Sequence, residues 1–220
     1  VLEGIRRLCY KLGLNKSERI GKLGLLPDVL GFKRTSIRGQ IPTIFDYAEN
    51  PIAISIPGYN EDHINAKLRW EVAQSIGNPI KEEQVIKEAY EVFAKKKEDV
   101  LAKLENDDWD LFMVHFLYPD LLQHLRWYRE DQIRELYEEL DETTQLFKDK
   151  AKDCLTLIVS DHGHKRGVHT PHGFYSCNQT LGLNKPKITD FAEIIKQELG
   201  APTEEEIEQI KKRLEEWGYF

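Results

Sequence analysis

The sequence contains little cysteine, a single methionine and no long apolar run. Its 220 residues include three cysteines, Cys9, Cys154 and Cys177, and one methionine, Met113. Three cysteines cannot all pair with one another, and these show no metal-binding spacing, which favours a reducing compartment. No stretch reaches the roughly 18 apolar residues of a membrane span, and no signal peptide opens the sequence. We therefore expect a cytoplasmic protein that does not associate with membranes.

The chain also lacks the excess of basic residues that is typical of nucleic-acid-binding proteins. It has 38 Asp and Glu against 31 Lys and Arg, which gives a net charge of −7 and argues against dedicated nucleic-acid binding. Apolar residues make up 40% and charged residues 31% of the chain, a composition typical of a globular domain rather than a disordered segment. Abundant charge with little Cys and Met indicates a thermophilic source.

The first 40 residues differ from the rest of the chain in charge. Residues 1–40 contain nine basic and three acidic side chains, a net charge of +6. This glycine-rich segment is expected to be irregular and to pack on the core or on a part of the protein upstream of Val1. Residues 41–200 are expected to form the main domain, and residues 201–220 a C-terminal helix.

Apolar patterning predicts an alternation of strands and helices. Short apolar runs predict buried strands over residues 52–56, 111–117 and 154–159. Helical spacing predicts helices over residues 41–50, 81–105, 121–150 and 188–199. A strand, a long helix and a further strand form a βαβ unit, so we expect strands 111–117 and 154–159 to pair in parallel. The fold class is therefore expected to be α/β.

Acidic residues and histidines follow two of the predicted strands. Asp120 and His124 are four residues apart at a helix start, so they share one face about 6 Å apart, close enough to bind one ion. Asp161 and His162 directly follow the next strand. Ligands bind at the carboxyl ends of strands in open α/β sheets, which favours a common site for both pairs.

The types of side chain in these pairs predict the chemistry of the site. Asp and His ligands without cysteine suit Zn²⁺, Mn²⁺ or Co²⁺ in a catalytic rather than a structural site. Two acid–histidine pairs and a further histidine exceed what one tetrahedral ion can use, so we expect two ions roughly 4 Å apart. Two such ions bind the attacking and leaving oxygens of a phosphoryl displacement, which predicts hydrolysis of a phosphate ester.

Other residues near the two pairs have more than one interpretation. His172 and His169 compete for the fifth ligand position, and we favour His172 because a glycine follows it. His164 either orients a ligand carboxylate, serves as an alternative ligand, or is an exposed turn residue. Lys165 and Arg166 either bind a substrate phosphate or lie in a solvated loop. His115, within a predicted strand, is interpreted as a core histidine.

At these residues the sequence resembles the alkaline phosphatase superfamily, and most closely its type I phosphodiesterase/nucleotide pyrophosphatase branch. The matching segments lie within residues 40–200 in the order Pro119-Asp120 with His124, Ser160-Asp161-His162-Gly163, and His172-Gly173. The resemblance implies that Asp120, His124 and His172 hold one ion, and that Asp161 and His162 hold the other. It implies an alkaline-phosphatase-like fold with a mostly parallel central sheet and helices on both faces. Its substrate would be a small phosphodiester or nucleotide.

Two features depart from the pattern of this family. Gln123 stands where the family has a glycine before its ligand histidine. The family also takes a further Asp ligand and a Thr or Ser nucleophile from an N-terminal segment, to which nothing in this sequence corresponds. Thr35 and Ser36 lack the surrounding motif, so we expect the nucleophile upstream of Val1. The chain is accordingly expected to lack the N-terminal part of the fold.

Other activities remain open at this point. A phosphomonoesterase, a sulfatase or a metal-dependent phosphoglycerate mutase of the same superfamily would share the ligand pattern. Without its nucleophile the chain would be a metal-binding fragment with no catalytic activity. A serine hydrolase using Ser160 or Ser176 is disfavoured, because the sequence contains no G-x-S-x-G motif. The oligomeric state is not predicted.

Overall fold

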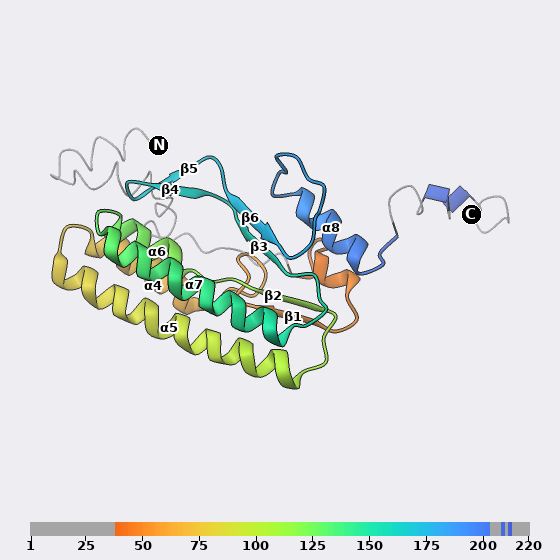
Figure 1. Cartoon of the computed structure of the whole chain (residues 1–220), viewed down its shortest axis with the longest axis horizontal. Helices are drawn as coiled ribbons and strands as arrows, with labels where there is room; N and C mark the ends of the chain where they lie inside the picture. Colours follow the sequence, from red (N-terminus) through yellow and green to blue (C-terminus); the bar gives the residue numbers. More distant parts are fainter. Residues whose placement is uncertain (1–37, 203–207, 210, 213–220) are drawn as a thin grey trace.

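The computed structural model describes residues 38–202, 208–209 and 211–212 (Figure 1). The predicted segment 1–40 and the predicted C-terminal helix over 201–220 lie almost wholly outside the described residues. The elements, in chain order, are η1 (Ile44–Tyr47), β1 (Pro51–Ile54), α4 (His63–Ser75), α5 (Pro79–Asn106), β2 (Leu111–Val114), α6 (Tyr118–Arg126), α7 (Glu130–Lys150), β3 (Leu157–Ser160), β4 (Gly163–Lys165), β5 (Val168–Thr170), β6 (Phe174–Cys177) and α8 (Asp190–Glu198). Within the described residues, none of the helices has the length and apolar character required to cross a membrane.

The parallel pairing in this fold joins β1 to β2. Ile52 lies opposite Phe112 and Ile54 lies opposite Val114 in this two-stranded sheet. Parallel strands need a crossover connection, and here α4 and α5 supply it. The 3-10 helix η1 and the strands β1 and β2 are each shorter than predicted, and Ser55, with a φ of 56°, follows β1 directly.

The predicted parallel pairing of segments 111–117 and 154–159 is wrong. Strand β3 pairs with β6 in antiparallel register, with Leu157 opposite Cys177 and Ser160 opposite Phe174. The chain turns back through β4 and β5 directly after β3, and this short return favours antiparallel over crossover pairing. The described strands form three two-stranded sheets. The mixture of helices and strands fits the predicted α/β class, but these residues do not form a large parallel sheet.

Strand β3 is also less buried than predicted. Ile158 and Val159 are 38% and 37% exposed, although the continuous apolar run predicts a strand covered on both faces. Met113 of β2 and Phe174 of β6 are likewise exposed. Apolar side chains therefore lie on the accessible surface of these strands.

Helices α4, α5 and α6 enclose the main apolar core. Its buried members are Leu68, Val72, Ala73, Ile76, Val85, Ala89, Leu117, Leu121 and Leu125. Helix α4 was not predicted, because Asn65 and Arg69 lie on its buried face and interrupt the apolar pattern. This core fixes the position of α6, the helix that bears Asp120 and His124.

The predicted helix over residues 121–150 is interrupted. Helix α6 ends at Arg126 and α7 begins at Glu130, with Trp127 as the C-cap residue of α6. The intervening residues include neither glycine nor proline, so local sequence carries no signal for this break. Buried Arg126 pairs with Glu82 of α5 at 2.8 Å, which ties the end of α6 to the helical layer.

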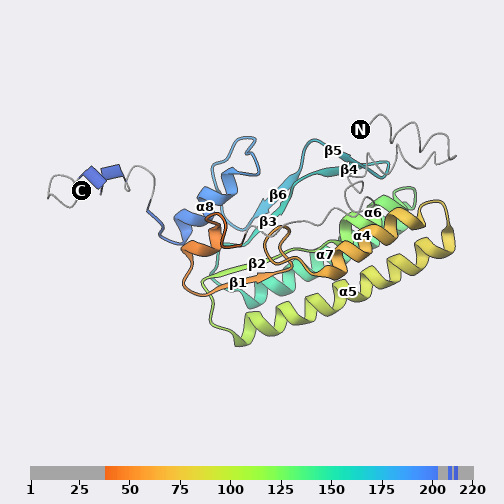
Figure 2. The same ribbon diagram turned by 180° about the vertical axis from the view of Figure 1, so that it is seen from behind.

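The elements are arranged with helices α4 to α7 on one side and the β3–β6 and β4–β5 ribbons on the other. Figures 1 and 2, from opposite sides, both place the β4–β5 hairpin over α6 and place α8 beside η1. Histidines of the hairpin thereby meet the acid–histidine pair of α6.

Candidate metal centre

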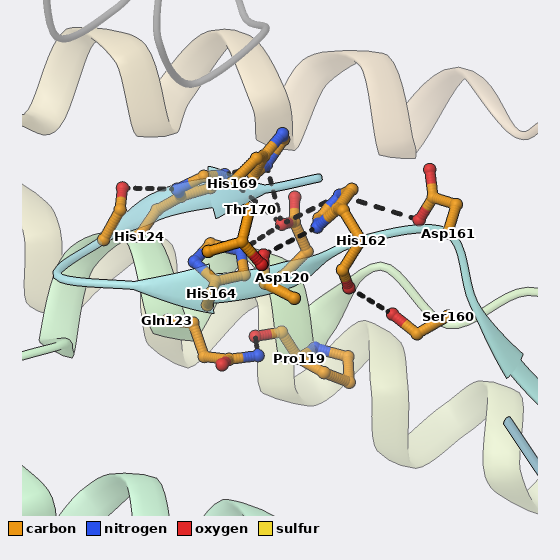
Figure 3. Close-up of polar contacts among 12 residues, drawn as sticks. Pro119, Asp120, Gln123, His124, Ser160, Asp161, His162, His164, His169 and Thr170 are labelled. Atoms are coloured by element: carbon orange, nitrogen blue, oxygen red, sulfur yellow. Dashed lines mark hydrogen bonds and ion pairs between the residues drawn. The ribbon is translucent and has the colours of Figure 1, made fainter. Parts of the chain in front are cut away.

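Asp120 lies in the first turn of α6, and its carboxylate faces the β4–β5 hairpin (Figure 3). Asp120 Oδ1 lies 2.8 Å from His164 Nε2, 3.3 Å from His169 Nε2 and 3.9 Å from His162 Nε2. This one carboxylate oxygen is therefore the common neighbour of three imidazoles that come from another part of the chain.

The hairpin explains why two of these imidazoles arrive together. His164 of β4 and His169 of β5 are directly opposite each other in antiparallel register. Cross-strand partners lie on the same face of a sheet, so both rings project toward α6. The five-residue separation in sequence thus becomes direct contact in space, with ring centroids 5.1 Å apart.

His124, one helical turn after Asp120, completes the group from the other side. Its side chain is fully buried, and its Nε2 lies 3.3 Å from Asp120 Oδ1 and 3.0 Å from His169 Nε2. Its Nδ1 lies 3.1 Å from the carbonyl oxygen of Gly167. Because a carbonyl oxygen can only accept a hydrogen bond, Nδ1 carries the proton and the neutral ring directs the lone pair of Nε2 toward Asp120.

His162 shows the same arrangement as His124. Its Nδ1 donates to the carbonyl oxygen of Gly163 at 3.3 Å, and its ring stacks on His169 with centroids 3.6 Å apart. The Nε2 lone pair of His162 is therefore also directed toward the Asp120 carboxylate. An Nδ1–H bonded to a carbonyl, with Nε2 left free, is the usual state of a metal-binding histidine.

This set of donor atoms fits a divalent cation. One ligand atom each from Asp120, His162, His164 and His169 lie within 4.8 Å of one another. Four ligands at about 2.0 Å around tetrahedral zinc lie about 3.3 Å apart, and the distances from Asp120 Oδ1 fall on both sides of this value. Nitrogen lone pairs directed at a carboxylate repel it, and a cation between them removes that repulsion. The cluster can therefore bind a metal ion.

The protonation of the cluster follows from burial and hydrogen bonding. Burial alone would raise the pKa of Asp120, but the neighbouring imidazoles, including those of His164 and His169, outweigh burial and hold this pKa well below its usual range. Burial lowers the pKa of His164, although its bond to Asp120 acts in the opposite direction. An ionised carboxylate beside neutral imidazoles is the state that binds cations.

Asp161 and His172 lie outside the group of four donors. The side chain of Asp161 is 76% exposed, and its Oδ1 lies 3.6 Å from His162 Nε2. His172 is exposed and its backbone carbonyl lies beside Gly163 and Thr170. The structure therefore brings together Asp120, His124 and His162 of the predicted ligands with His164 and His169, which the sequence offered as alternative ligands.

The remaining predicted residues lie on the same hairpin or beside it. Lys165 and Arg166 are both exposed, and Arg166 occupies the turn between β4 and β5. His115 follows β2, is partly buried, and its Nδ1 has no hydrogen-bond partner among the described residues. The interpretation of His115 as a core histidine with satisfied hydrogen bonds is therefore wrong for Nδ1, which is buried without a partner among these residues.

The sequence analysis missed Gly167, whose carbonyl oxygen accepts the hydrogen bond from His124. A signal for it was present, because a glycine in a two-residue loop between alternating segments is typical of a β-hairpin. The antiparallel approach of His164 and His169 follows from that hairpin.

Comparisons with known proteins agree with this chemistry. No curated protein and no solved structure matches the chain. A family model described as type I phosphodiesterase / nucleotide pyrophosphatase matches residues 36–215, which include all five clustered side chains. The chain therefore belongs to the type I phosphodiesterase / nucleotide pyrophosphatase family.

Proposed function

We propose that this chain carries the metal-binding half of a phosphodiesterase site, which hydrolyses phosphodiester or nucleotide pyrophosphate bonds by a two-metal mechanism. The observation that carries the proposal is the convergence of Asp120 with imidazoles from α6 and from the β4–β5 hairpin. Family membership supports hydrolysis of a small phosphodiester or nucleotide. Residues 41–200 form the domain that bears this site.

The first ion is assigned to Asp120 and His124, with a third ligand from the region of residues 169–172. The geometry favours His169 over the His172 that the sequence favoured, because His169 Nε2 lies 3.3 Å from Asp120 Oδ1. His164 acts in this proposal as the donor that orients the Asp120 carboxylate.

The second ion is assigned to Asp161 and His162, as the resemblance implies. Their side chains are adjacent at 3.6 Å, and the Nδ1–H of His162 is held by a backbone carbonyl. The hydroxyl nucleophile and one further carboxylate are assigned to sequence upstream of Val1. Lys165 and Arg166, exposed on the hairpin, are assigned to the substrate phosphate.

Divalent ions held by these residues, Zn²⁺ or else Mn²⁺ or Co²⁺, would lower the pKa of the attacking hydroxyl or water and would neutralise the leaving oxygen. The protein supplies an ionised Asp120 carboxylate, because the neighbouring imidazoles lower its pKa, and a His124 ring whose Nδ1 proton is bonded to a backbone carbonyl oxygen. Nitrogen and oxygen donors without thiolates suit this group of metals.

The test compares metal content and hydrolysis in the wild type and in Asp120→Ala, Asp161→Ala and His162→Ala. Bound zinc is counted by elemental analysis after loading. Turnover is followed with bis-p-nitrophenyl phosphate and p-nitrophenyl phosphate, in this chain and in its upstream-extended reading frame. We expect each variant to lose metal and diester cleavage together, while Asp141→Ala, an exposed acid on α7, retains both.

The outcomes separate the candidate functions. Preference for the monoester would indicate a phosphomonoesterase, and cleavage of neither ester would leave a sulfatase, a mutase or a metal-binding fragment without catalytic activity. Unchanged metal content in Asp120→Ala would contradict the proposed site itself. Cytoplasmic location and a thermophilic source stay predictions.

A further inference from the structure

The hairpin that carries His164 and His169 ends in a two-residue turn, Arg166-Gly167. Lys165 and Val168 are paired on either side of it, and both turn residues have positive φ, 55° for Arg166 and 72° for Gly167. This is the geometry of a type I′ turn, whose twist matches that of antiparallel strands. The position of the Gly167 carbonyl group is therefore defined by the hairpin itself.

That carbonyl group is directed at the ligand histidine of α6. Gly167 O accepts the hydrogen bond from His124 Nδ1 at 3.1 Å, and both residues are buried. In water either ring nitrogen of a neutral histidine can carry the proton. Here the carbonyl oxygen favours the proton on Nδ1, so the lone pair is on Nε2, the atom that faces Asp120 and His169.

Trp127 holds the turn in this place. A Cβ atom on Gly167 would lie 2.5 Å from Trp127 Cδ1 and 3.2 Å from the carbonyl oxygen of His124. A contact of 2.5 Å essentially never occurs at a real Cβ atom, so a residue other than glycine must displace the turn or the indole ring. Trp127 is the C-cap residue of α6 and follows His124 by three residues, so the turn lies against the end of the helix that bears this histidine.

We propose that the Arg166-Gly167 turn positions His124 for metal binding, by holding its ring in the tautomer and orientation that present Nε2 to an ion beside Asp120. The proposal rests on the metal-dependent function proposed above. Gly167 acts through His124 and touches neither ion nor substrate, so it is a positioning residue. Hydrogen-bond partners of this kind typically change metal affinity 10–100-fold when they are altered.

The decisive variant is Gly167→Ala, with Gly182→Ala as its matched control. Gly182 also has a positive φ, 64°, but a Cβ there would meet nothing within 4 Å. Both substitutions place a side chain at a positive φ, and only Gly167→Ala also adds a close contact with Trp127 that pushes on the turn. We expect Zn²⁺ to bind about 10–100-fold more weakly to Gly167→Ala than to the control, as measured by titration of the full chain with Zn²⁺ alone.

A second pair of variants tests whether the contact with Trp127 is the cause. In a chain that already carries Trp127→Ala, the added Cβ of Gly167→Ala meets no indole ring. In that chain, Gly167→Ala should reduce the Zn²⁺ affinity no more than Gly182→Ala does.

A spectroscopic measurement reads the tautomer without any substitution. Nitrogen NMR of the histidine rings in the metal-free wild type should show the proton of His124 on Nδ1. A proton on Nε2 would overturn the inference even if Gly167→Ala failed to fold. Equal Zn²⁺ affinity of Gly167→Ala and Gly182→Ala would overturn it as well and leave the proposed function standing. A wild type that binds no Zn²⁺ would overturn both.

Discussion

The Asp120 carboxylate is oriented by a hydrogen bond from His164 as well as by its place on helix α6. His164 Nε2 lies 2.8 Å from Asp120 Oδ1, the shortest of the contacts around that oxygen, and the His164 side chain is almost completely buried. Since an ionised carboxylate can only accept a hydrogen bond, His164 donates this bond from Nε2. The Nδ1 of His164 has no hydrogen-bond partner among the described residues. A histidine in this state orients the carboxylate through Oδ1.

We expect His164→Ala to weaken Zn²⁺ binding about tenfold, because the Asp120 carboxylate loses the donor that orients it. Titration of the full chain with Zn²⁺ measures this. His63→Ala, an exposed histidine at the start of α4, is the control and should bind as the wild type does. Equal affinities of the two variants would contradict the orienting role.

His115 predicts a dependence of stability on pH. Burial, together with the nearby charges of Lys96 and Arg69, lowers the pKa of His115 in the folded protein below its usual 6.5. The unfolded chain therefore takes up this proton first as the pH falls. The free energy of unfolding contributed by neutral His115 is complete above about pH 6.5 and is lost as the pH falls toward the lowered pKa, by about 1.4 kcal/mol per unit of lowering.

Urea denaturation at pH 7.5 and pH 5.5, with a chelator present, measures this effect. The wild type should lose more stability between the two pH values than His115→Gln does. Some dependence remains in the variant, because burial also lowers the pKa of His164. An identical pH dependence in the two proteins would show that His115 titrates alike in the folded and unfolded states.

At the scale of elements, the link between α5 and α6 depends on a buried ion pair. Arg126 pairs with Glu82 at 2.8 Å, with side chains 7% and 11% exposed, and Glu82 also accepts from the backbone of Gly77. Arg126→Ala leaves this carboxylate buried without its cation. We expect a loss of about 3 kcal/mol in the free energy of unfolding, measured by urea denaturation.

Arg129 provides the matched control for that substitution. It pairs with Asp131 at 2.9 Å, but both side chains are about half exposed. Exposed pairs contribute little, so Arg129→Ala should cost at most about 1 kcal/mol. Similar losses of unfolding free energy in both variants would contradict the expectation that burial makes the Arg126 pair more important for stability.

Local pattern predicted some elements well and others not at all. Helix α5 was predicted almost to its ends, because its apolar residues repeat at helical spacing. Helix α4 was missed because Asn65 and Arg69 are buried by tertiary contacts, which composition does not reveal. The break after Arg126 was missed because it is maintained by Glu82 and by the hairpin rather than by local residues.

At the scale of the whole molecule, a bound ion would join two layers. The donors come from α6 and from the ribbon that contains His162, His164 and His169. An ion that binds only the folded chain stabilises it by about 2.7 kcal/mol at a concentration one hundred times its Kd. We therefore expect Zn²⁺ to raise the thermal unfolding midpoint and a chelator to reverse the shift.

The same measurement decides between the two competing histidines. His169→Ala should lose most of the Zn²⁺-dependent shift in the unfolding midpoint, because its Nε2 lies 3.3 Å from Asp120 Oδ1. His172→Ala, which removes an exposed ring outside the cluster, should retain it. The reverse result would support the ligand set that the sequence favoured.

The sequence by itself determined the family, the α/β character and the pairing of Asp120 with His124, since four-residue spacing on a helix dictates a shared face. Tertiary structure alone decided which histidines meet that pair. His169 and His172 are separated by only two residues and are chemically identical, and the glycine that follows His172 does not determine which ring meets the pair. The β4–β5 register places His169 opposite His164 and directs both toward α6, whereas His172 lies beyond the end of β5. Register depends on the turn and on the partner strand, which lie outside any short window of sequence.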